Sequence, residues 1–508
     1  MKVVALFSGH EASAVVLEDG VVKNYFREER YSRKKHDSGI EHIYQMILES
    51  DPDYIILSTN YDEDEKRDLI RKVNPRVKFI ETRESVHHLH HASLAFYNSG
   101  FDKALVVVVD ACGGVVGDDE YEGESIYFAT YPCKFTPVYK NNWTGENVIH
   151  DPNIGNLYNT AALAIGQTID DCGKAMGLSS YGNRIFEIKF TLDRVNNYFQ
   201  ECPDFKDVML GGRDRYHIDI TKDNYQKFAD YCCEVQWHCQ EKVCALVDKY
   251  VKQHGVKKVC LSGGYAMNIL TNYQLIKRFP EVEFYFEPLC DDGGNSIGAA
   301  MYAYRKLTQD MTVKPITTTA HHGNSHKTDL TAWDIDGEYA EANDIARLLY
   351  MNKSVAVFNG QAESGQRALG NRSILFNALN PDARDIVNRI KKREWYRPFA
   401  AIVLEEDAHL YFDDVIPNPY MTVCFPVKTD LIPGVTHVDK TCRVQTVSTG
   451  HLYDLLLEFK RLSGHGILLN TSFNLAGEPL VETPEQGINT LSGSELDYLW
   501  FYETKQLL

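Results

Sequence analysis

The chain has 508 residues, of which 44% are hydrophobic and 24% charged, and its formal net charge is −18. This length exceeds what a single hydrophobic core usually organises, so we expect two domains. The negative charge argues against a nucleic-acid polymer or an anionic membrane surface as partner, because both require a basic surface.

Strand-like and helical stretches alternate over the first two-thirds of the chain, which indicates an α/β domain. Residues 2–9 and 12–26 predict a hairpin around Asp19-Gly20, a pair that such turns favour. Residues 256–270 predict a strand, a glycine turn and a helix. Further buried strands are predicted at 53–59, 77–82, 103–110 and 282–289, and a helix at 295–307.

The last third predicts a second α/β unit. Residues 311–323 lack a clear hydrophobic period and are interpreted as a crossover. Strands are predicted at 354–360, 399–406 and 466–472. We therefore place one domain at 1–322 and another at 333–508.

The cysteines and the N-terminus bear on the cellular compartment. The twelve cysteines are scattered without a CxxC pair, which indicates reduced thiols rather than a disulfide framework. The residues after Met1 lack a signal-peptide pattern, and no apolar run approaches the roughly 18 residues of a membrane span. We expect a cytoplasmic protein that does not cross a membrane, and no pattern indicates its oligomeric state.

Two histidines and two acidic positions predict a metal site. His87 and His91 are one helical turn apart, so a helix places both on one face. Asp110 closes a buried apolar strand, where a carboxylate is costly unless it is paired or bound to metal. An acidic pair, Asp291-Asp292, lies in a glycine-rich stretch. Two imidazoles with carboxylates suit Fe(II) or Zn(II), with positions left open for a ligand.

Three glycine-containing turns follow predicted strands: Ser8-Gly9-His10, Asp110 to Gly114, and Ser262-Gly263-Gly264. Each alone is a weak signal, because such turns are common and a tight loop would be the more frequent explanation. Together they resemble the phosphate and adenosine loops of the actin/hexokinase-like ATPase fold. Small residues let backbone N–H groups approach phosphate oxygens. Nucleotide contacts are therefore expected at Gly9, Asp110, Gly113, Gly263 and Gly264.

The second unit has arginines within loops that contain Gly, Ser and Asn. A run of charge is usually a solvated face, but these arginines do not follow a helical stripe. Guanidinium groups match the geometry of phosphate and carboxylate, so we interpret them as an anion site. The residues are Arg367, Arg372, Arg393, Arg397 and Arg443.

Longer motifs resemble one family over nearly the whole chain. "GHEASAVVLEDG", "HHLHHASLAFYNSGF", "GKAMGLSSYG", "LSGGYAMN" and "DDGGNSIGAA" resemble, in order, signatures of the NodU/CmcH-type O-carbamoyltransferases. In the second unit, "GQAESGQRALGNRSI", "KKREWYRPFAAIV", "KTCRVQTV" and "LLNTSFNLAGEPLVETP" continue the match. The resemblance implies an actin/hexokinase-like (Kae1-like) α/β domain followed by a YrdC-like α/β domain.

The resemblance also implies roles for residues of the first domain. In the family, an HxxxH pair and two aspartates hold an Fe(II) ion that contacts nucleotide phosphates, and the matching positions are His87, His91, Asp110 and Asp292. We prefer Asp292 to its neighbour because it directly precedes the Gly-Gly segment. His10 matches the family histidine that is suited to act as general base. Lys35 matches a lysine near the carbamoyl adenylate, where a cation stabilises the acyl phosphate.

For the second domain, the resemblance implies a site for carbamoyl phosphate and ATP. The matching residues are Arg367, Arg397, Arg443, Asn470 and Ser472.

Four positions depart from the family pattern: Glu11 replaces Asp, Cys172 replaces Glu, Gln366 replaces Pro, and Ala401 replaces Pro. Cys172 removes a carboxylate near the nucleotide, which leaves the details of that contact open.

Taken together, the motifs predict an ATP-dependent enzyme that forms carbamoyl adenylate and transfers the carbamoyl group to an acceptor hydroxyl. Its substrates would be carbamoyl phosphate, ATP as co-substrate, and a small hydroxyl-bearing molecule, with Fe(II) or another divalent metal as cofactor. One alternative is threonylcarbamoyl transfer to adenosine in tRNA, which the acidic charge argues against. Another is a non-catalytic nucleotide-binding regulator, which the arginine-rich second unit argues against. The residues do not specify the acceptor.

Overall fold

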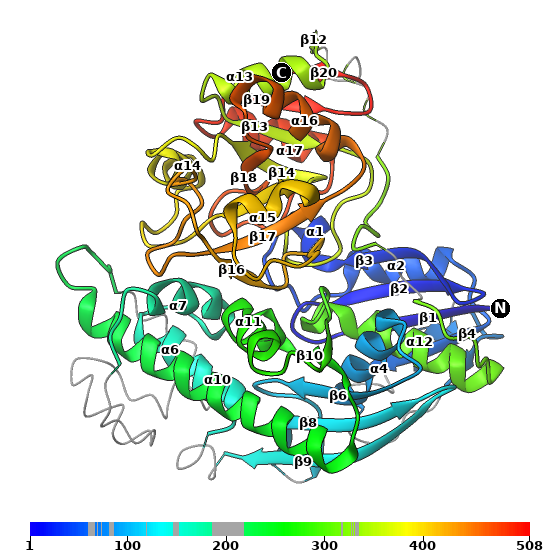
Figure 1. Ribbon diagram of the computed structural model, residues 1–508. Coiled ribbons are helices and arrows are strands. Elements are labelled where there is room, and N and C mark those ends of the chain that lie inside the picture. The colour runs from blue at the N-terminus through cyan, green and yellow to red at the C-terminus, as the bar shows by residue number, and fades with distance from the viewer. Residues whose placement is uncertain are drawn as a thin grey trace. The chain divides into compact units, whose positions relative to one another are not determined.

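The computed structural model describes residues 1–58, 67–68, 70–72, 74–80, 86–117, 119–145, 152–184, 218–315, 319–326, 328, 330 and 335–508. The chain divides into two compact units (Figure 1). The first comprises Met1–Lys23 and Ser38–Thr318, and the second comprises Asn24–Asp37 and Thr319–Leu508. Residue 333, the predicted start of the second domain, and residues 316–318 of the predicted crossover lie outside the described residues.

The first sheet of the first unit has the order β3-β2-β1-β4-β5. Strand β2 is antiparallel to β1, whereas β4 is parallel to β1 and β5 is parallel to β4. Asp19 and Gly20 both have positive φ, 48° and 78°, and they form the predicted turn between β2 and β3. The strands are β1 (Lys2–Phe7), β2 (Ser13–Glu18), β3 (Val21–Arg27), β4 (Tyr54–Ser58) and β5 (Lys78–Phe79).

The second sheet of this unit repeats the same plan. Strand β6 has the antiparallel strand β8 on one side and the parallel strand β10 on the other, and β11 is parallel to β10. Strands β7 and β9 both pair with β8. This duplicated order is the arrangement of the actin/hexokinase-like fold, and the predicted α/β class is confirmed. The strands are β6 (Lys103–Val109), β7 (Val115–Gly117), β8 (Glu120–Thr130), β9 (Lys134–Thr144), β10 (Lys258–Ser262) and β11 (Glu283–Phe286).

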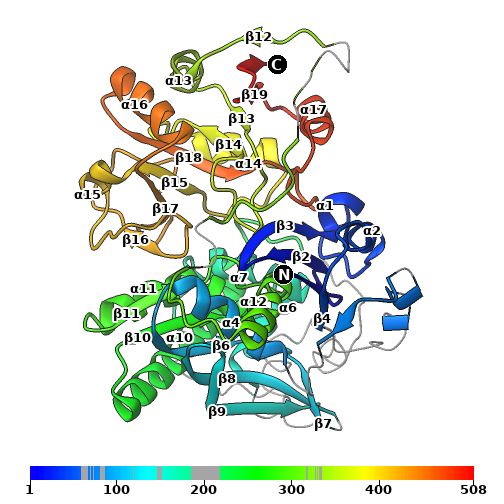
Figure 2. The same ribbon diagram turned by 90° about the vertical axis from the view of Figure 1, so that its right-hand side faces the viewer.

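Two helices, α4 (His87–Ser99) and α12 (Asn295–Thr308), pack against each other between the two sheets. Figures 1 and 2 show α12 beside β1 and β2, and α4 beside β6. Gly298 permits the close approach of the helices, because a Cβ there would lie 2.0 Å from the carbonyl oxygen of His90.

The other described helices of the first unit pack around these sheets and against one another. Helix α10 packs against α6, α7 and α11 and contacts β6, while α2 contacts β2. The helices are α2 (Glu41–Glu49), α6 (Ile154–Ala164), α7 (Cys172–Ser179), α10 (Gln226–His254) and α11 (Ile269–Arg278).

The second unit is built on a nine-stranded mixed sheet of order β12-β20-β19-β13-β14-β18-β15-β17-β16. Strands β13, β15 and β18 coincide with the three strands predicted for this unit. The strands are β12 (Glu338–Tyr339), β13 (Val355–Phe358), β14 (Arg372–Phe376), β15 (Ala400–Leu404), β16 (Cys424–Pro426), β17 (Thr441–Val447), β18 (Ile467–Ser472), β19 (Tyr498–Phe501) and β20 (Gln506–Leu507). The helices are α1 (Glu28–Ser32), α13 (Ala342–Tyr350), α14 (Ala383–Lys391), α15 (Ala408–Tyr411), α16 (His451–Ser463) and α17 (Pro484–Ser492).

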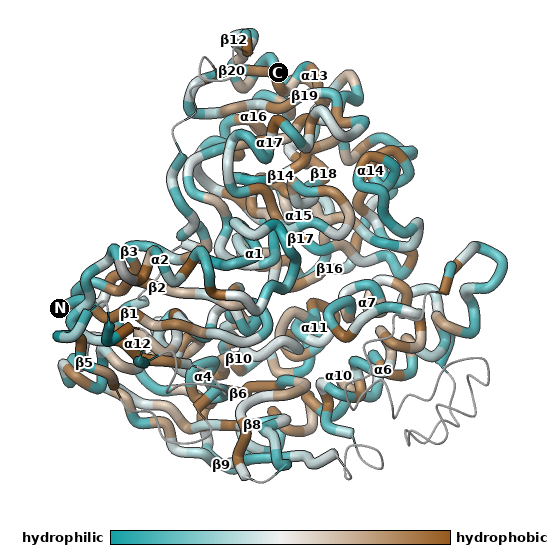
Figure 3. The backbone as a smooth tube through the Cα atoms, turned by 180° about the vertical axis from the view of Figure 1, so that it is seen from behind, coloured by the Kyte–Doolittle hydropathy of each residue, from teal (hydrophilic) through white to brown (hydrophobic). Residues whose placement is uncertain are grey.

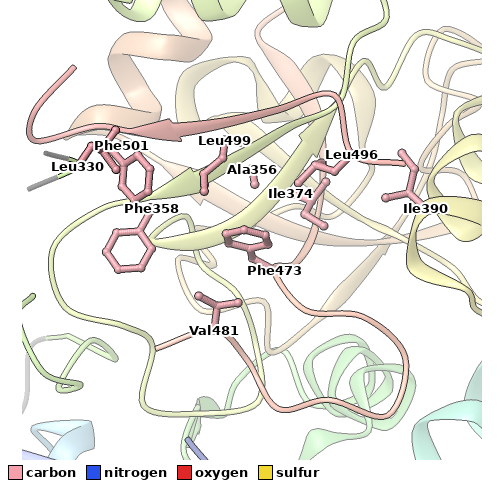
Figure 4. Close-up of a cluster of buried hydrophobic side chains, with 10 residues drawn as sticks. All are labelled: Leu330, Ala356, Phe358, Ile374, Ile390, Phe473, Val481, Leu496, Leu499 and Phe501. Atoms are coloured by element: carbon pink, nitrogen blue, oxygen red, sulfur yellow. The ribbon is translucent and has the colours of Figure 1, made fainter. Parts of the chain in front are cut away.

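Hydrophobic side chains from several of these strands form a core in the second unit (Figure 4). Phe358 and Phe501 lie at one end of the cluster with ring centroids 5.4 Å apart, and Ile390 and Leu496 lie at the other end. In the first unit, Figure 3 shows hydrophobic residues along interior strands such as β6, which is buried beyond Lys103. Within the described ranges, no helix combines the length and apolar character that crossing a membrane requires.

Candidate functional site

Helix α4 carries the two predicted metal-binding histidines at its beginning. His87 and His91 are buried, and their Nε2 atoms lie 3.2 Å apart, because a spacing of four residues places both on one helix face. His88 and His90 point elsewhere, and Nδ1 of each lies 2.6 Å from a serine hydroxyl. Burial lowers their pKa values to about 4 and about 3, so both are neutral core residues.

Two carboxylates complete the group around these imidazoles. Asp110 directly follows β6, and its Oδ2 lies 3.3 Å from His87 Nε2 and 3.5 Å from His91 Nε2. Asp292 precedes α12, and its Oδ1 lies 3.4 Å and 3.3 Å from the same two atoms. One ligand atom from each of the four residues lies within 4.8 Å of the others. Ligand bonds of about 2.1 Å separate neighbouring ligand atoms by about 3.0–3.4 Å, so the group has the dimensions of a metal site.

The charges of the four residues favour a cation at their centre. Burial by itself raises the pKa of a carboxyl, but His87 and His91 hold the pKa of Asp110 well below its usual range and also lower that of Asp292. Burial lowers the pKa of His87, yet the two aspartates raise it to about 10. Positive charge is therefore stabilised here, and a divalent cation can replace the protons on the imidazoles.

Two of the predicted glycine turns converge on this group. Gly263 has φ of +84°, and a Cβ there would lie 2.4 Å from the carbonyl oxygen of Val109, so only glycine fits. A Cβ on Gly264 would lie 3.5 Å from Asp110 Oδ1, which places this turn beside the carboxylate. Gly113 packs against the ring of His88 in the same region. The glycines of both turns therefore bring the backbone close to the cluster.

The remaining turn carries His10, which follows Gly9 at the end of β1. His10 Nε2 lies 2.7 Å from Oδ1 of Asp170, a residue that sequence reasoning did not identify. Burial lowers the pKa of His10, but the hydrogen bond with Asp170 and the charges of Glu11, Asp170 and Asp292 raise it to about 10. In the sequence, the signal that could have pointed to Asp170 was its position two residues before Cys172 in the family-like stretch "IDDCGKAMGL".

Cys172 stands where the family has a glutamate. Its Sγ lies 3.2 Å from Asn159 Oδ1, and burial raises the pKa of the thiol to about 12. The side chain is therefore a neutral thiol and supplies no charge for a nucleotide.

Lys35 belongs to the second unit, whereas His10 belongs to the first. The side chain of Lys35 is exposed. Burial and the charges of two arginines lower the pKa of Lys391 most, and the charge of Lys35 lowers it further. Arg30, on the same segment, donates a hydrogen bond from Nη2 to the carbonyl oxygen of Gly365 at 2.9 Å. The expectation that Lys35 lies within a domain spanning 1–322 is therefore wrong, because tertiary packing joins segment 24–37 to the second unit.

The arginines of the second unit form a compact cationic cluster. Burial and the charges of Arg397, Arg443 and Arg367 hold the pKa of Arg393 well below its usual range. Burial and the charges of Arg367 and Arg397 also hold the pKa of Arg443 well below its usual range. The Nε atoms of Arg393 and Arg443 are buried and have no hydrogen-bond partner within the part of the chain that the structure describes. Like charges gathered in this way are stabilised by a bound anion.

Lys391, which was absent from the predicted set, lies in the same cluster. Burial, Arg393 and Arg397 hold its pKa well below the usual range. Its Nζ donates to the carbonyl oxygen of Ser472 and, at 2.7 Å, to Asn474 Oδ1. Ser472 therefore contributes to the site partly by orienting a lysine.

Arg372 has a different role from the one predicted. Its Nη1 donates to the carbonyl oxygen of Asn359 at 2.7 Å, and its Nη2 donates to that of Gly360 at 3.0 Å. The guanidinium also lies 3.5 Å from the ring centroid of Phe358. Both terminal nitrogens of Arg372 donate hydrogen bonds within the protein, and the residue is fully buried. Arg372 therefore stabilises the fold and is not available to bind an anion.

The loop that carries Arg367 is fixed by hydrogen bonds. Glu363 Oε1 accepts a hydrogen bond from the backbone N–H of Leu369 at 2.7 Å. Asn470 Nδ2 donates to the carbonyl oxygen of Ala368 at 3.1 Å. Asn470 thus positions this loop from strand β18.

Comparison with known proteins identifies the family of the chain. The family model described as "Carbamoyltransferase N-terminus" matches residues 55–301, and that described as "Carbamoyltransferase C-terminus" matches residues 346–505. The chain belongs to the carbamoyltransferase family. It is therefore a member of a family of transferases.

Several relatives of this carbamoyltransferase extend over most of its length. A protein from Synechocystis sp. is 27% identical, and the match covers 96% of this chain and 94% of that protein. The nodulation protein NolO of Bradyrhizobium diazoefficiens is 29% identical, with 81% and 77% covered. Among solved structures, full-length HypF in its phosphate- and nucleotide-bound form is similar with a TM-score of 0.36 and 15% identity, covering 60% of this chain and 47% of that one. This structural similarity is weak and adds nothing to the assignment.

Proposed function

We propose that this carbamoyltransferase forms carbamoyl adenylate from carbamoyl phosphate and ATP and then transfers the carbamoyl group to an acceptor hydroxyl. The observation that carries the proposal is the presence of two chemically distinct sites in one family member. One is a cationic cluster suited to phosphates, and the other is a His/Asp group beside glycine turns. A single-step transfer directly from carbamoyl phosphate would need only one of them.

The first half-reaction is proposed for the second unit. Water releases carbamate from carbamoyl phosphate with loss of phosphate, and a carbamate oxygen attacks the α-phosphorus of ATP and expels pyrophosphate. Negative charge accumulates on phosphoryl oxygens in both steps. Arg367, Arg393, Arg397 and Arg443 would stabilise it, because their positive charges lie close enough to lower one another's pKa values and would be relieved by an anion. Lys391 would add a further donor.

The second half-reaction is proposed for the first unit. His87, His91, Asp110 and Asp292 would hold a divalent cation, for which Fe(II) is the candidate, and the cation would bind nucleotide phosphate oxygens. The turns at Gly113, Gly263 and Gly264 would direct backbone N–H groups at the same phosphates. Enclosure of the adenylate limits its loss to water.

His10 is proposed to take the proton from the acceptor hydroxyl. The acceptor oxygen then bonds to the carbamoyl carbon, the bond from that carbon to the phosphate oxygen breaks, and AMP leaves. Asp170 orients the imidazole through its contact with Nε2. A cation bound at Asp292 would offset one of the charges that raise the pKa of His10, and this brings the imidazole toward the range in which it accepts a proton.

The test follows the two half-reactions separately. Purified protein given carbamoyl phosphate, MgATP and Fe²⁺ should release pyrophosphate and form carbamoyl adenylate. His10→Asn should retain this step and lose carbamoyl transfer to a panel of hydroxyl acceptors, including saccharides. His409→Asn, at an exposed position of α15, serves as control. If pyrophosphate release does not depend on carbamoyl phosphate, the proposed adenylate is wrong.

A further inference from the structure

Side chains hold three consecutive backbone carbonyl groups in the loop 368–371 of the second unit. Asn470 on β18 and Gln445 on β17 donate to the first two carbonyl oxygens, at 3.1 and 2.8 Å. The third contact is made by His451, the first residue of α16, whose Nε2 lies 3.1 Å from the carbonyl oxygen of Gly370. His451 therefore ties the end of this loop to a helix rather than to the sheet.

Neighbouring side chains fix which nitrogen of His451 carries the proton. Asn371 Nδ2 donates to the carbonyl oxygen of Gln361 at 2.8 Å, so the other end of this amide, Oδ1, is an acceptor. It accepts from Asn359 Nδ2 at 3.1 Å, and the same Nδ2 lies 3.2 Å from His451 Nδ1. Because an amide nitrogen only donates, Nδ1 is the acceptor and Nε2–H donates to the carbonyl oxygen of Gly370. Burial lowers the pKa of His451, which agrees with a neutral ring.

The backbone at Gly370 has little room for another position. Its φ is +119°, and a Cβ there would lie 2.2 Å from Leu452 Cδ1, so the loop packs directly on the first turn of α16. On the other side of the loop, Glu363 Oε1 accepts hydrogen bonds from three backbone N–H groups, at 2.7, 2.9 and 3.3 Å. Side chains from four separate elements thus specify the conformation of this loop.

The loop bears on the anion site through Arg367, which directly precedes it. The charge of Arg367 lowers the pKa values of Arg393 and Arg443, so its guanidinium lies close to theirs. Gly370 is only three residues further along the chain. A shift of its carbonyl group would therefore change where Arg367 directs its guanidinium, and binding of an anion between several cations depends on such placement.

We propose that His451 is a positioning residue of the anion site, which holds the loop through the Gly370 carbonyl oxygen and so presents Arg367 to the phosphate group of the bound anion. This inference rests on the proposed function for the identity of that anion, carbamoyl phosphate. The hydrogen bond from Nε2, rather than the aromatic ring, carries the effect.

The test measures binding of inorganic phosphate to the full-length protein from the rise of its melting temperature with phosphate concentration. The half-saturating concentration reports affinity and does not depend on the stability of the unliganded variant. His451→Phe keeps a ring beside Tyr502, whose centroid is 5.1 Å away, but cannot donate, and it should raise the half-saturating concentration about 3- to 10-fold. His451→Gln should restore the parent value, because its amide can donate to Gly370 and accept from Asn359.

His465→Phe is the matched control. His465 is a half-buried histidine of the same unit, its Nδ1 lies 3.2 Å from the hydroxyl of Tyr411, and the two ring centroids are 6.1 Å apart. This variant loses a comparable imidazole contact and should bind phosphate as the parent protein does. In the assay of pyrophosphate release, His451→Phe should raise KM for carbamoyl phosphate, whereas His465→Phe should not.

The outcomes separate the inference from the proposed function. If His451→Phe has the half-saturating phosphate concentration of the parent protein, or if His451→Gln does not restore it, the inference is wrong and the anion site stands. If phosphate does not stabilise the parent protein, the anion site is overturned, and the inference with it. If phosphate binding follows the expected order but no pyrophosphate is released, His451 keeps its role and the adenylate is wrong. Should His451→Phe fail to fold, His451→Leu is measured in its place with the same expectations.

Discussion

The carboxylate of Glu122 accepts a hydrogen bond from the backbone N–H of His88 at 3.1 Å, one residue after the metal-group histidine His87. It also accepts hydrogen bonds from the backbone N–H of Gly114, at 3.3 Å, and from Lys140 Nζ. One fully buried carboxylate therefore joins the beginning of α4 to the second glycine turn. Glu122 therefore helps to fix the relative positions of the helix and the turn.

Replacing Glu122 should destabilise the first unit in a pH-dependent way. Burial raises the pKa of this carboxyl, but His88 and Lys140 lower it, so that the pKa is about 2 instead of the usual 4.5. Because the pKa is depressed in the folded state, the ionised group stabilises the fold above pH 4.5, and this contribution is lost as pH falls toward 2. Glu122→Gln should cost about 3 kcal/mol at pH 7 and much less near pH 2. Urea denaturation at several pH values measures this, and a pH-independent difference would contradict it.

Gly298→Ala should disrupt the packing of α12 on α4. The added Cβ would lie 2.0 Å from the carbonyl oxygen of His90, so the helices must separate. We expect a loss of about 1–3 kcal/mol of stability and weaker metal binding, since Asp292 moves with α12. Gly173→Ala is the matched control, because a Cβ on this helical glycine meets nothing within 4 Å. Equal melting temperatures for the two variants would show that the close approach is not required.

Three members of the His/Asp group have local sequence signals, whereas Asp292, which meets His91 across 201 residues, was assigned through the family resemblance. The HxxxH spacing fixes two side chains on one helix face, and a carboxylate at the end of a buried strand such as Asp110 marks a site. Asp170 was not predictable, since it meets His10 across 160 residues of chain. No sequence period encodes such contacts. For the same reason, the sequence did not reveal that Lys35 packs with the second unit.

Strands were likewise predictable only where the sequence carries a local hydrophobic signal. Strands with continuous apolar runs, such as β6 and β13, were predicted, and the structure confirms them. Strands β8 and β9 were not predicted, although each has eleven residues. Their sequences intersperse Glu, Lys, Asn and Thr among apolar residues, and β9 has no buried residue. Pairing in the sheet, rather than a hydrophobic pattern, determines their conformation.

Phosphate should stabilise the second unit through the cationic cluster. Arg393 and Arg443 repel each other and their neighbours in the absence of an anion, so an anion that binds only the folded state raises the melting temperature. Arg443→Ala should reduce this phosphate-induced shift and should raise KM for carbamoyl phosphate. Arg461→Ala, at an exposed position on α16 of the same unit, is the control and should respond to phosphate as the parent protein does. A phosphate-induced shift that is unchanged in Arg443→Ala would remove this residue from the anion site.

Asp170→Asn should lower the pKa of His10. Burial lowers this pKa, and the hydrogen bond from His10 Nε2 to Asp170 is the largest effect that raises it to about 10. A raised pKa in the folded state means that the pair stabilises the protein fully below pH 6.5, and this contribution is lost as pH rises toward 10. The variant should therefore titrate nearer 6.5, which NMR of the imidazole resonances can follow, with His10→Asn to assign the signal. The carbamoyl-transfer step should shift its pH dependence to lower pH, while pyrophosphate release, which is assigned to the other unit, should not. A parallel shift in both half-reactions would show that Asp170 acts on the whole protein rather than on His10.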